Sequence, residues 1–356
     1  MEPVVIIGAG PSGLAAAACL KRLDIPFALL DRTGRAGGAF HQMDRNLKLL
    51  SPRRYVNLPH FRYPGNEDYP SMPDYESYLE EYARHFGLLP TPAEVTAIRR
   101  LPGGFEVQCV SAANLRCQFL VVATGLFGHP VWPEIPGLVA GKGGPEAPTV
   151  MHARDWAGAK ACAGRRILII GAGISGVGIA EECARAGLSV MVSYRSRRVR
   201  LLRPRLLGRD ILDWFRPLEF LPRGFFGSLC HRGLHAPAYD NGYRAFVEAA
   251  KITELPEVKQ VQGRKVWFVD GSLREVDAIV AATGYRYETP FLPAEVHRMP
   301  GGHPMANDCE SPDWPGLFFV GVPCSRRINS EFLRGIASDA VRVAGRIRRR
   351  LGSRPE

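Results

Sequence analysis

The stretch Val4-Val-Ile-Ile-Gly8-Ala-Gly10-Pro-Ser-Gly13 decides the fold of this 356-residue chain. Its apolar, β-branched start predicts a buried strand, and the G-x-G-x-x-G spacing predicts a tight turn that leads into a helix. In such a unit the first glycine permits the turn, the second lets a pyrophosphate approach the backbone, and the third lets the helix pack on the strand. The stretch therefore predicts a Rossmann-like dinucleotide-binding unit, with the pyrophosphate at the helix N-terminus.

The same pattern returns as Ile167-Leu-Ile-Ile-Gly171-Ala-Gly173-Ile-Ser-Gly176. Both copies follow an apolar run and precede an alanine-rich helical stretch, which is the context that the motif requires. Two copies predict two bound dinucleotides. The alternative is a pair of glycine-rich turns without a ligand.

Residues about 20 positions after each turn distinguish the two sites. The first unit has Asp31 there, and its carboxylate can accept hydrogen bonds from an unphosphorylated ribose, as in FAD or NAD. The second unit has no acid and offers Ser193, Arg195, Arg197 and Arg198. A hydroxyl and three guanidiniums suit a 2′-phosphate, which favours NADPH over NADH. The alternative is a solvated arginine loop.

Each unit also contains a later apolar run that ends in Ala-Thr-Gly, at 119–125 in the first and at 277–284 in the second. Such runs predict buried parallel strands, and their glycines would let the chain pass close to the bound nucleotide. Taken singly, each run is equally consistent with an ordinary strand end.

Composition excludes several classes of protein. With 46% hydrophobic and 23% charged residues the chain is expected to fold, and its apolar runs are far shorter than the ~20 residues of a membrane span. The start of the chain indicates a buried strand and not a signal peptide, so we expect a cytoplasmic protein. The net charge of +11 is dispersed and no nucleic-acid-binding module is present, so no nucleic acid partner is expected. The eight cysteines show no C-x-x-C pair or metal-ligand spacing, so we expect reduced thiols and no metal site.

These residues resemble the flavin-containing monooxygenase family, including the plant YUCCA-type enzymes and small bacterial organoarsenical monooxygenase-like members. The similarity spans nearly the whole chain and includes Gly37-Gly38-Ala39-Phe40, the segment 47–59, Ala282-Thr283-Gly284-Tyr285 and the ending 316–335. The resemblance implies a class B flavoprotein monooxygenase that uses FAD, NADPH and O2. Such an enzyme inserts one oxygen atom into a small nucleophilic substrate through a flavin C4a-(hydro)peroxide.

The motifs and the resemblance together imply the following site residues. Cofactor-binding residues are expected at Gly8, Gly10, Pro11, Ser12, Gly13, Asp31, Arg32, Gly38, Ala39, Phe40, Thr124, Gly125 and Gly321, and at Gly171, Gly173, Ser175, Gly176, Ser193, Arg195, Arg198, Thr283, Gly284 and Tyr285. Catalytic candidates that line a pocket over the flavin are Ser51, Arg53, Tyr55 and Asn57, with Arg326, Asn329 and Phe332 from the tail.

The chain departs from the family pattern at two places. Of the family's F-x-G-x-x-x-H-x-x-x-Y stretch only His152 and Trp156 remain, and this H-x-x-x-W half leans toward Baeyer-Villiger monooxygenases. Leu50 stands near the position of an asparagine that animal-type members place by the flavin. The alternatives are therefore a Baeyer-Villiger-type enzyme, an NADPH-dependent flavin reductase without oxygen transfer, and a nucleotide-binding sensor without turnover.

The expected fold class is α/β, with two Rossmann-like domains of which the NADPH domain is inserted in the FAD domain. The predicted boundaries are 1–155 and 286–356 for the FAD domain and 160–285 for the NADPH domain. A capping box from Ser71 to Asp74 predicts a helix with an aromatic core stripe, and a final helix is predicted over 331–351. The segment 195–243 predicts an insertion that lines or covers the substrate entrance; a peripheral membrane contact and a homodimer contact are its alternatives.

Overall fold

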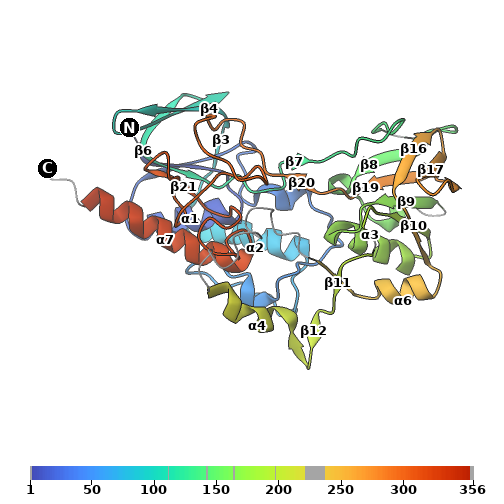
Figure 1. Ribbon diagram of the computed structural model, residues 1–356. Helices are drawn as coiled ribbons and strands as arrows, with labels where there is room; N and C mark the ends of the chain where they lie inside the picture. Colours follow the sequence, from blue (N-terminus) through green and yellow to red (C-terminus); the bar gives the residue numbers. More distant parts are fainter. Residues whose placement is uncertain are drawn as a thin grey trace.

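The computed structural model describes residues 2–110, 112–141, 143–162, 165–196, 198–220 and 237–352. Two separate sheets lie at the two ends of an elongated molecule (Figure 1). Each sheet carries one of the two glycine turns at the end of a central strand. The predicted α/β class with two dinucleotide-binding units is confirmed, and the domain boundaries stay a prediction.

The first sheet has seven strands within the described residues, in the order β3-β2-β1-β6-β5-β4, with β21 paired to β6. They are β1 (Glu2–Ile7), β2 (Phe27–Asp31), β3 (Thr91–Pro92), β4 (Glu94–Leu101), β5 (Gly104–Val110), β6 (Leu115–Val122) and β21 (Leu317–Phe319). Strand β1 is parallel to β2 and β6, and β21 is parallel to β6. The chain thus returns to this sheet after it has built the second one.

The second sheet is entirely parallel in the described part of the chain, in the order β15-β10-β9-β19-β8. Its strands are β8 (Thr149–His152), β9 (Arg166–Ile170), β10 (Ser189–Ser193), β15 (Ile252–Leu255) and β19 (Ala278–Ala281). Helices α3 (Ile174–Arg185) and α6 (Tyr243–Glu248) cover one face. The antiparallel strands β16 (Val258–Gln262), β17 (Lys265–Phe268) and β18 (Leu273–Glu275) cover the other.

Side chains of the central strands alternate between two cores, as the period of two in a strand requires. Val4 and Ile6 of β1 pack in one core with α1 (Pro11–Lys21) and α7 (Leu333–Gly352), whereas Val5 and Ile7 pack in a second core on the other face. Because both faces are covered, these strands are apolar throughout. Both strands that end in Ala-Thr-Gly are likewise buried and parallel to the strand that carries the glycine turn, as predicted.

Helix α2 (Met72–His85) begins where the capping box predicts, since the Ser71 hydroxyl accepts a hydrogen bond from the Asp74 amide. Its aromatic stripe is confirmed as core, because Tyr75, Tyr78 and Tyr82 are buried. Their hydroxyls donate to the carbonyls of Val56, Phe61 and Pro59, so the helix also holds the loop 56–61 in place. The predicted C-terminal helix is confirmed as α7, which packs on α1.

The two connections between the sheets are paired with one another. Strand β7 (His129–Pro130) leaves the first unit and runs antiparallel to β20 (Tyr285–Arg286), which returns from the second. The Thr283 hydroxyl and the Gly284 carbonyl extend this ribbon through hydrogen bonds to the Val131 backbone. The two connections therefore form a single two-stranded ribbon.

The predicted insertion contains several short elements. They are β11 (Leu201–Leu202), β12 (Arg205–Leu206), β13 (Arg209–Asp210), α4 (Ile211–Phe215) and β14 (Ala238–Tyr239). Part of the insertion, residues 221–236, lies outside the described residues. Within the described residues, no helix has both the length and the apolar composition to cross a membrane.

Six cysteines are free thiols in the structure, namely Cys19, Cys109, Cys117, Cys162, Cys183 and Cys309. Burial raises the pKa of Cys19 to about 12, so this thiol stays protonated and unreactive at neutral pH. Cys324 is disulfide-bonded, so the expectation of reduced thiols throughout is wrong at this position.

Candidate functional site

In the first glycine turn, two glycines lie so close to neighbouring backbone atoms that there is no room for a side chain at either position. A Cβ atom on Gly13 would overlap the carbonyl oxygen of Gly8, and one on Gly8 would lie 2.5 Å from the Ala123 carbonyl oxygen. Gly8 also has a φ of +103°, which glycine adopts without strain. By contrast, a Cβ atom on Gly10 would meet no atom within 4 Å. The open space at Gly10 lies at the N-terminus of α1, where the helix dipole favours an anion.

The second turn repeats this arrangement residue by residue. A Cβ atom on Gly176 would overlap the Gly171 carbonyl oxygen, and one on Gly171 would overlap that of Ala282. Gly171 has a φ of +108°, close to the value at Gly8. Gly173, at the N-terminus of α3, again has no atom within 4 Å of its Cβ position. Both turns therefore leave room for a pyrophosphate at their second glycine, which fits the two predicted dinucleotides.

Asp31 stands at the end of β2, beside the first turn. Its Oδ2 atom accepts a hydrogen bond from the Ala9 amide at 2.9 Å, and its Oδ1 atom accepts one from the Thr33 amide at 2.8 Å. A carboxylate accepts up to about four hydrogen bonds, so these contacts leave capacity for a ribose hydroxyl. Arg32 beside it is exposed.

The residues expected near a 2′-phosphate divide into two groups. Ser193 is completely buried, and its hydroxyl donates to the Pro256 carbonyl at 2.6 Å. This residue therefore ties β10 to the loop after β15, which does not favour it as a phosphate ligand. Arg195 and Arg198 are exposed, and neither side chain has an ion pair within the described residues. Arg197 lies outside the described residues.

Other expected cofactor-binding residues gather around the first turn. A Cβ atom on Gly38 would lie 3.0 Å from the Gly10 Cα atom, so the loop with Ala39 packs directly on the turn. Phe40 is buried, with its ring 5.0 Å from that of Tyr75. Gly321, which follows β21, leaves space for the Ser12 side chain because it has no Cβ of its own. The tail after Gly321 therefore passes the start of α1, beside Pro11.

His41 joins this loop to α2. Its Nδ1 atom lies 2.6 Å from Glu76 Oε1, and its Nε2 atom lies 2.6 Å from the Ala36 carbonyl oxygen. His41, Glu76 and Glu80 place possible metal-ligand atoms within 4.8 Å of one another. Because both ring nitrogens of His41 already face hydrogen-bond acceptors of the chain, we interpret the group as a structural link.

The catalytic candidates from Ser51 to Asn57 lie on a short helical turn over 53–55 and on the chain at either side of it. Tyr55 donates its hydroxyl hydrogen to Asp213, and Arg54 forms an ion pair with the same carboxylate at 2.7 Å. Asn57 accepts from the Tyr63 amide and donates to the Arg54 carbonyl, so its amide holds the loop together. Ser51 is buried, and Arg53 is exposed.

Asp213 belongs to a segment of the insertion that crosses to the first unit, which we name the strap (residues 205–219). Three of its acids contact that unit. Asp213 binds Tyr55 and Arg54, Asp210 accepts from the Tyr69 hydroxyl, and Glu219 forms an ion pair with Arg334. Asn329 donates to Glu219 at 3.1 Å, while its own Oδ1 atom is buried without a partner in the described part of the chain. The strap thus contacts both of the predicted residues Tyr55 and Asn329, through Asp213 and Glu219 respectively.

Sequence reasoning missed one carboxyl group in the tail. Burial raises the pKa of Glu331 to about 7, so this group can hold or release a proton near neutral pH. Arg326 is committed elsewhere, because it forms an ion pair with the buried Asp339 at 3.1 Å. Glu331 lies in an irregular segment, so no periodic pattern in the sequence could have predicted that it is buried.

His152 and Trp156 both have structural partners. The His152 ring is buried between Trp132 and Tyr285, with ring centroids 5.7 and 5.3 Å away, and burial lowers its pKa. The Trp156 indole donates to Glu182 Oε2 at 2.9 Å. Both residues lie at the junction of the two units.

Glu182 also links the two units. Its Oε1 atom accepts hydrogen bonds from the Ala159 amide at 2.8 Å and from the Asn46 side chain at 3.3 Å. Asp44 lies beside this contact, and its Oδ2 atom is buried without a partner among the described residues. Desolvation, with a smaller contribution from the negative charge of Glu182, raises the pKa of Asp44 to about 6.

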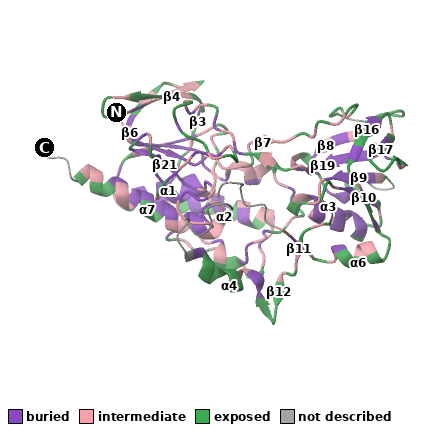
Figure 2. Cartoon of the chain, in the orientation of Figure 1, coloured by how far each residue is buried: buried purple, intermediate pink, exposed green. Residues whose placement is uncertain are grey.

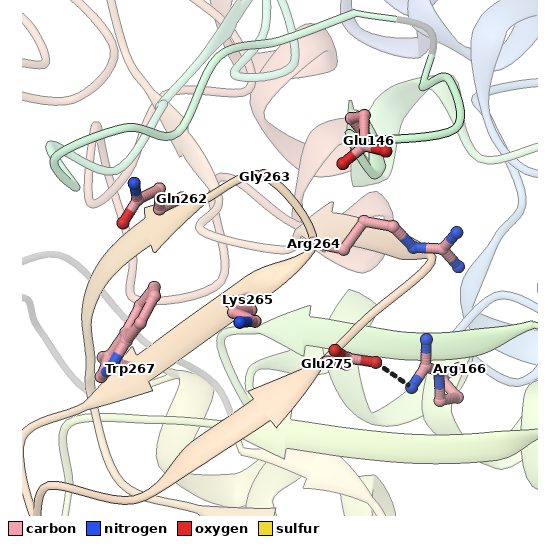
Figure 3. Close-up of a pocket in the computed structure, with 8 residues that line it drawn as sticks. All are labelled: Glu146, Arg166, Gln262, Gly263, Arg264, Lys265, Trp267 and Glu275. Atoms are coloured by element: carbon pink, nitrogen blue, oxygen red, sulfur yellow. Dashed lines mark hydrogen bonds and ion pairs between the residues drawn. The ribbon is translucent and has the colours of Figure 1, made fainter.

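A pocket of about 630 Å³ lies elsewhere, at the opposite edge of the second sheet (Figure 3). It is lined by Arg166 at the start of β9 and by Lys265 and Trp267 of β17, whereas the glycine turn follows the other end of β9. Arg166 is already paired with Glu275 at 3.1 Å and with Asp277. This pocket is therefore not part of either dinucleotide site.

Comparisons with known proteins agree with this geometry. Residues 5–206 match the pyridine nucleotide-disulphide oxidoreductase family. The probable indole-3-pyruvate monooxygenase YUCCA8 of Arabidopsis thaliana is 30% identical over 96% of this chain and 87% of its own length. The chain belongs to the flavin-containing monooxygenase family. It is a flavin-dependent monooxygenase that uses FAD, NADPH, O2 and a small-molecule substrate.

Solved structures share the fold. The flavin-containing monooxygenase from Stenotrophomonas maltophilia has a TM-score of 0.80 at 21% identity and covers 99% of this chain and 100% of its own. The bacillithiol disulfide reductase from Staphylococcus aureus has a TM-score of 0.75 at 20% identity, with 98% of both chains covered. Since one fold serves both kinds of enzyme, the function of this monooxygenase follows from its sequence relatives and not from its architecture. The alternatives of a reductase without oxygen transfer and of a Baeyer-Villiger enzyme are not favoured.

The open position at the second glycine of each turn yields a first prediction. We expect Gly10→Ala to fold, because its Cβ meets nothing in the protein, and to weaken FAD binding about tenfold or more by blocking the pyrophosphate. Gly173→Ala should fold with FAD bound and raise the KM for NADPH. Flavin absorbance of the purified variants and NADPH titrations check both results.

Matched controls are Gly13→Ala and Gly176→Ala, which place a Cβ atom on a carbonyl oxygen and should fail to fold. Normal FAD content in folded Gly10→Ala would contradict the assignment of the first turn.

The buried carboxyl group at the junction yields a second prediction. Because the pKa of Asp44 is higher in the folded state than in the unfolded chain, folding favours the protonated acid, and stability falls as the pH rises from about 4 through 6. Asp44→Asn removes this loss, and we expect the variant to exceed the wild type by about 1–2 kcal/mol in unfolding free energy at pH 7.5. Urea unfolding at pH 7.5 and pH 4.5 checks this prediction. An equal difference at the two pH values would show that Asp44 does not titrate between them.

Proposed function

We propose that the turn at Gly8–Gly13 holds FAD and that the turn at Gly171–Gly176 holds NADPH. The carboxylate of Asp31 supports the first assignment, because it can accept a hydrogen bond from an unphosphorylated ribose. The second assignment rests on Arg195 and Arg198, whose exposed guanidiniums suit the 2′-phosphate of NADPH. Thr124, Gly125, Thr283 and Gly284 follow the neighbouring strands and complete the edges of the two sites.

The cofactor preference can be tested directly. Arg195→Ala/Arg198→Ala should raise the KM for NADPH about tenfold or more and leave the KM for NADH nearly unchanged, since only NADPH carries the 2′-phosphate. Arg165→Ala, an exposed arginine at the other edge of the same sheet, is the matched control. Steady-state oxidation of both nucleotides gives the comparison. An equal loss for both nucleotides would refute the 2′-phosphate assignment.

The substrate of this monooxygenase is a small molecule that carries a carboxylate. This proposal rests on a surface pocket of about 410 Å³ that is lined by Arg53, Arg54 and Arg62 together with Asn57 and Tyr63. Arg54 is paired with Asp213, but neither Arg53 nor Arg62 has an ion pair within the described residues. Two such guanidiniums in one pocket suit bidentate binding of a carboxylate.

The names of the relatives suggest which carboxylates to test first. The plant relative at 30% identity is named for indole-3-pyruvate, a 2-oxo acid with an aromatic side chain. Aromatic 2-oxo acids and thioether-containing amino acids both carry a carboxylate, and they differ in the atom that would receive oxygen. A panel of both classes therefore distinguishes oxygenation at carbon from oxygenation at sulfur.

FAD and NADPH, when bound, supply the electrons and the oxygen chemistry that amino-acid side chains cannot supply. The chain binds the pyrophosphates at its two helix N-termini and excludes water from the reacting groups. The strap serves the second task by tying the turn with Tyr55 to Asn329 and Arg334 of the tail. Glu331 can hold or release a proton near neutral pH in the same part of the tail.

A substrate experiment tests this proposal. NADPH oxidation, O2 uptake, hydrogen peroxide and oxygenated product are measured with carboxylate substrates and with their neutral esters or amides. We expect Arg53→Gln/Arg62→Gln to raise the KM for carboxylates about tenfold or more without changing the KM for neutral analogues. Arg99→Gln, an exposed arginine on β4, is the control. If the Arg53→Gln/Arg62→Gln variant keeps the carboxylate preference of the wild type, this pocket is excluded as the substrate site.

A cytoplasmic location stays a prediction. The segment 195–243 allowed a homodimer contact or a peripheral membrane contact as alternatives to a cover over the substrate entrance. The acids on the inner side of the strap bind the first unit, which favours the cover over the other two alternatives for that side.

A further inference from the structure

The outer side of the strap carries an exposed apolar patch, consisting of Leu206, Leu207, Trp214, Phe215 and Leu218. These side chains are between 43% and 83% exposed. They come from the β12–β13 hairpin and from α4 with the turn that follows it, which project from one side of the molecule (Figures 1 and 2). Five large apolar side chains within 13 residues exceed the scattered exposure that is normal for a protein surface.

Leu207 stands at the tip of the β12–β13 hairpin, where it forms the two-residue turn together with Gly208. Its φ is +51°, in the left-handed region where glycine and asparagine are favoured, and its side chain is 83% exposed. The two-residue turn requires a positive φ at both of its residues, so the hairpin accounts for the backbone, but the leucine side chain gains little packing against the described residues. A large apolar side chain is thus exposed at the tip, where a partner outside the protein could cover it.

The patch is a single surface on an anchored support. The Trp214 indole donates to the Leu206 carbonyl at 3.2 Å, which joins α4 to the hairpin. On the opposite side, Asp210, Asp213 and Glu219 bind the first unit, so the patch faces away from it. Polar contacts on the opposite side therefore hold the support of these apolar side chains in place.

Four exposed arginines lie within or beside the same stretch of sequence: Arg203, Arg205, Arg209 and Arg216. Arg205 pairs with Asp68, and the Arg216 guanidinium lies 5.8 Å from the centre of the Tyr55 ring, whereas Arg203 and Arg209 have no ion pair within the described residues. Apolar and indole side chains between arginines are the composition of segments that lie in the interface of an anionic membrane. We propose that the hairpin tip and α4 dock this monooxygenase on an anionic lipid surface.

Charge distinguishes a lipid surface from a second copy of this chain. A symmetric dimer through the patch would bring the arginines of both copies together, and these like charges would repel. An anionic lipid surface complements the same arginines and accepts the apolar side chains at shallow depth. The net charge of +11 adds long-range attraction to such a surface. This inference does not depend on the proposed substrate.

Vesicle flotation tests the proposal with the full-length, FAD-loaded protein. Vesicles of phosphatidylcholine alone are compared with vesicles that also contain phosphatidylglycerol. We expect binding only to the second kind, and we expect Leu207→Gly to weaken it about fivefold to tenfold by removing one inserted side chain. Glycine also suits the positive φ, so the variant should fold at least as well as the wild type.

Two further variants give the matched comparisons. Leu89→Gly removes a leucine of similar exposure from the connection between α2 and β3 and should leave vesicle binding unchanged. Arg203→Gln/Arg209→Gln should weaken binding to anionic vesicles and reduce its dependence on salt. NADPH oxidation in solution should be the same in Leu207→Gly and in the wild type, which separates this test from that of the substrate pocket.

Failure of the wild type to bind either kind of vesicle would overturn the proposal. Equal binding by wild type and Leu207→Gly would overturn it as well. Sedimentation analysis tests the alternative that a second copy of the chain binds the patch. If the wild type is a dimer and Leu207→Gly is a monomer, the patch is assigned to that second copy.

Discussion

The close approach of helix and strand at the two glycine turns is the constraint on which the rest of the structure depends. Gly13 lies so near the Gly8 carbonyl that no side chain fits between them, and Gly176 stands in the same relation to Gly171. This contact sets the direction in which α1 and α3 leave their sheets. It thereby places the N-terminus of each helix, and the open second glycine, at the edge where a pyrophosphate binds.

A second level of organisation joins the two nucleotide units through polar groups. The connections pair as a ribbon of β7 and β20, Glu182 collects hydrogen bonds from both units, and the strap extends acids from the second unit to the first. Buried or half-buried polar contacts are specific in geometry, because an unpaired partner is costly. The units are therefore held in one arrangement by a few directional contacts, while each keeps its own hydrophobic core.

The strap has different surfaces on its two sides. Its acids face inward to tyrosine, asparagine and arginine side chains, whereas its leucines, tryptophan and phenylalanine face outward. From the sequence alone the segment 195–243 was a run of arginine and aromatic residues that suited a cover, a membrane contact or a dimer contact. The separation of acids from apolar side chains in space, which only the tertiary structure provides, supports the proposal that one segment serves two of these roles.

The sequence by itself determined the α/β class, the two glycine turns and the difference between Asp31 and the arginines of the second unit, because each depends on residues close together in the chain. Local signals also predicted α2, with its Ser71 cap, and α7. Tertiary structure alone decided that Ser193 is buried under Pro256, that Tyr55 meets Asp213, and that Asp44 and Glu331 have raised pKa values. Burial and pairing between distant segments set these properties, and no periodicity or spacing along the chain encodes which buried groups come together when two sheets and a strap pack.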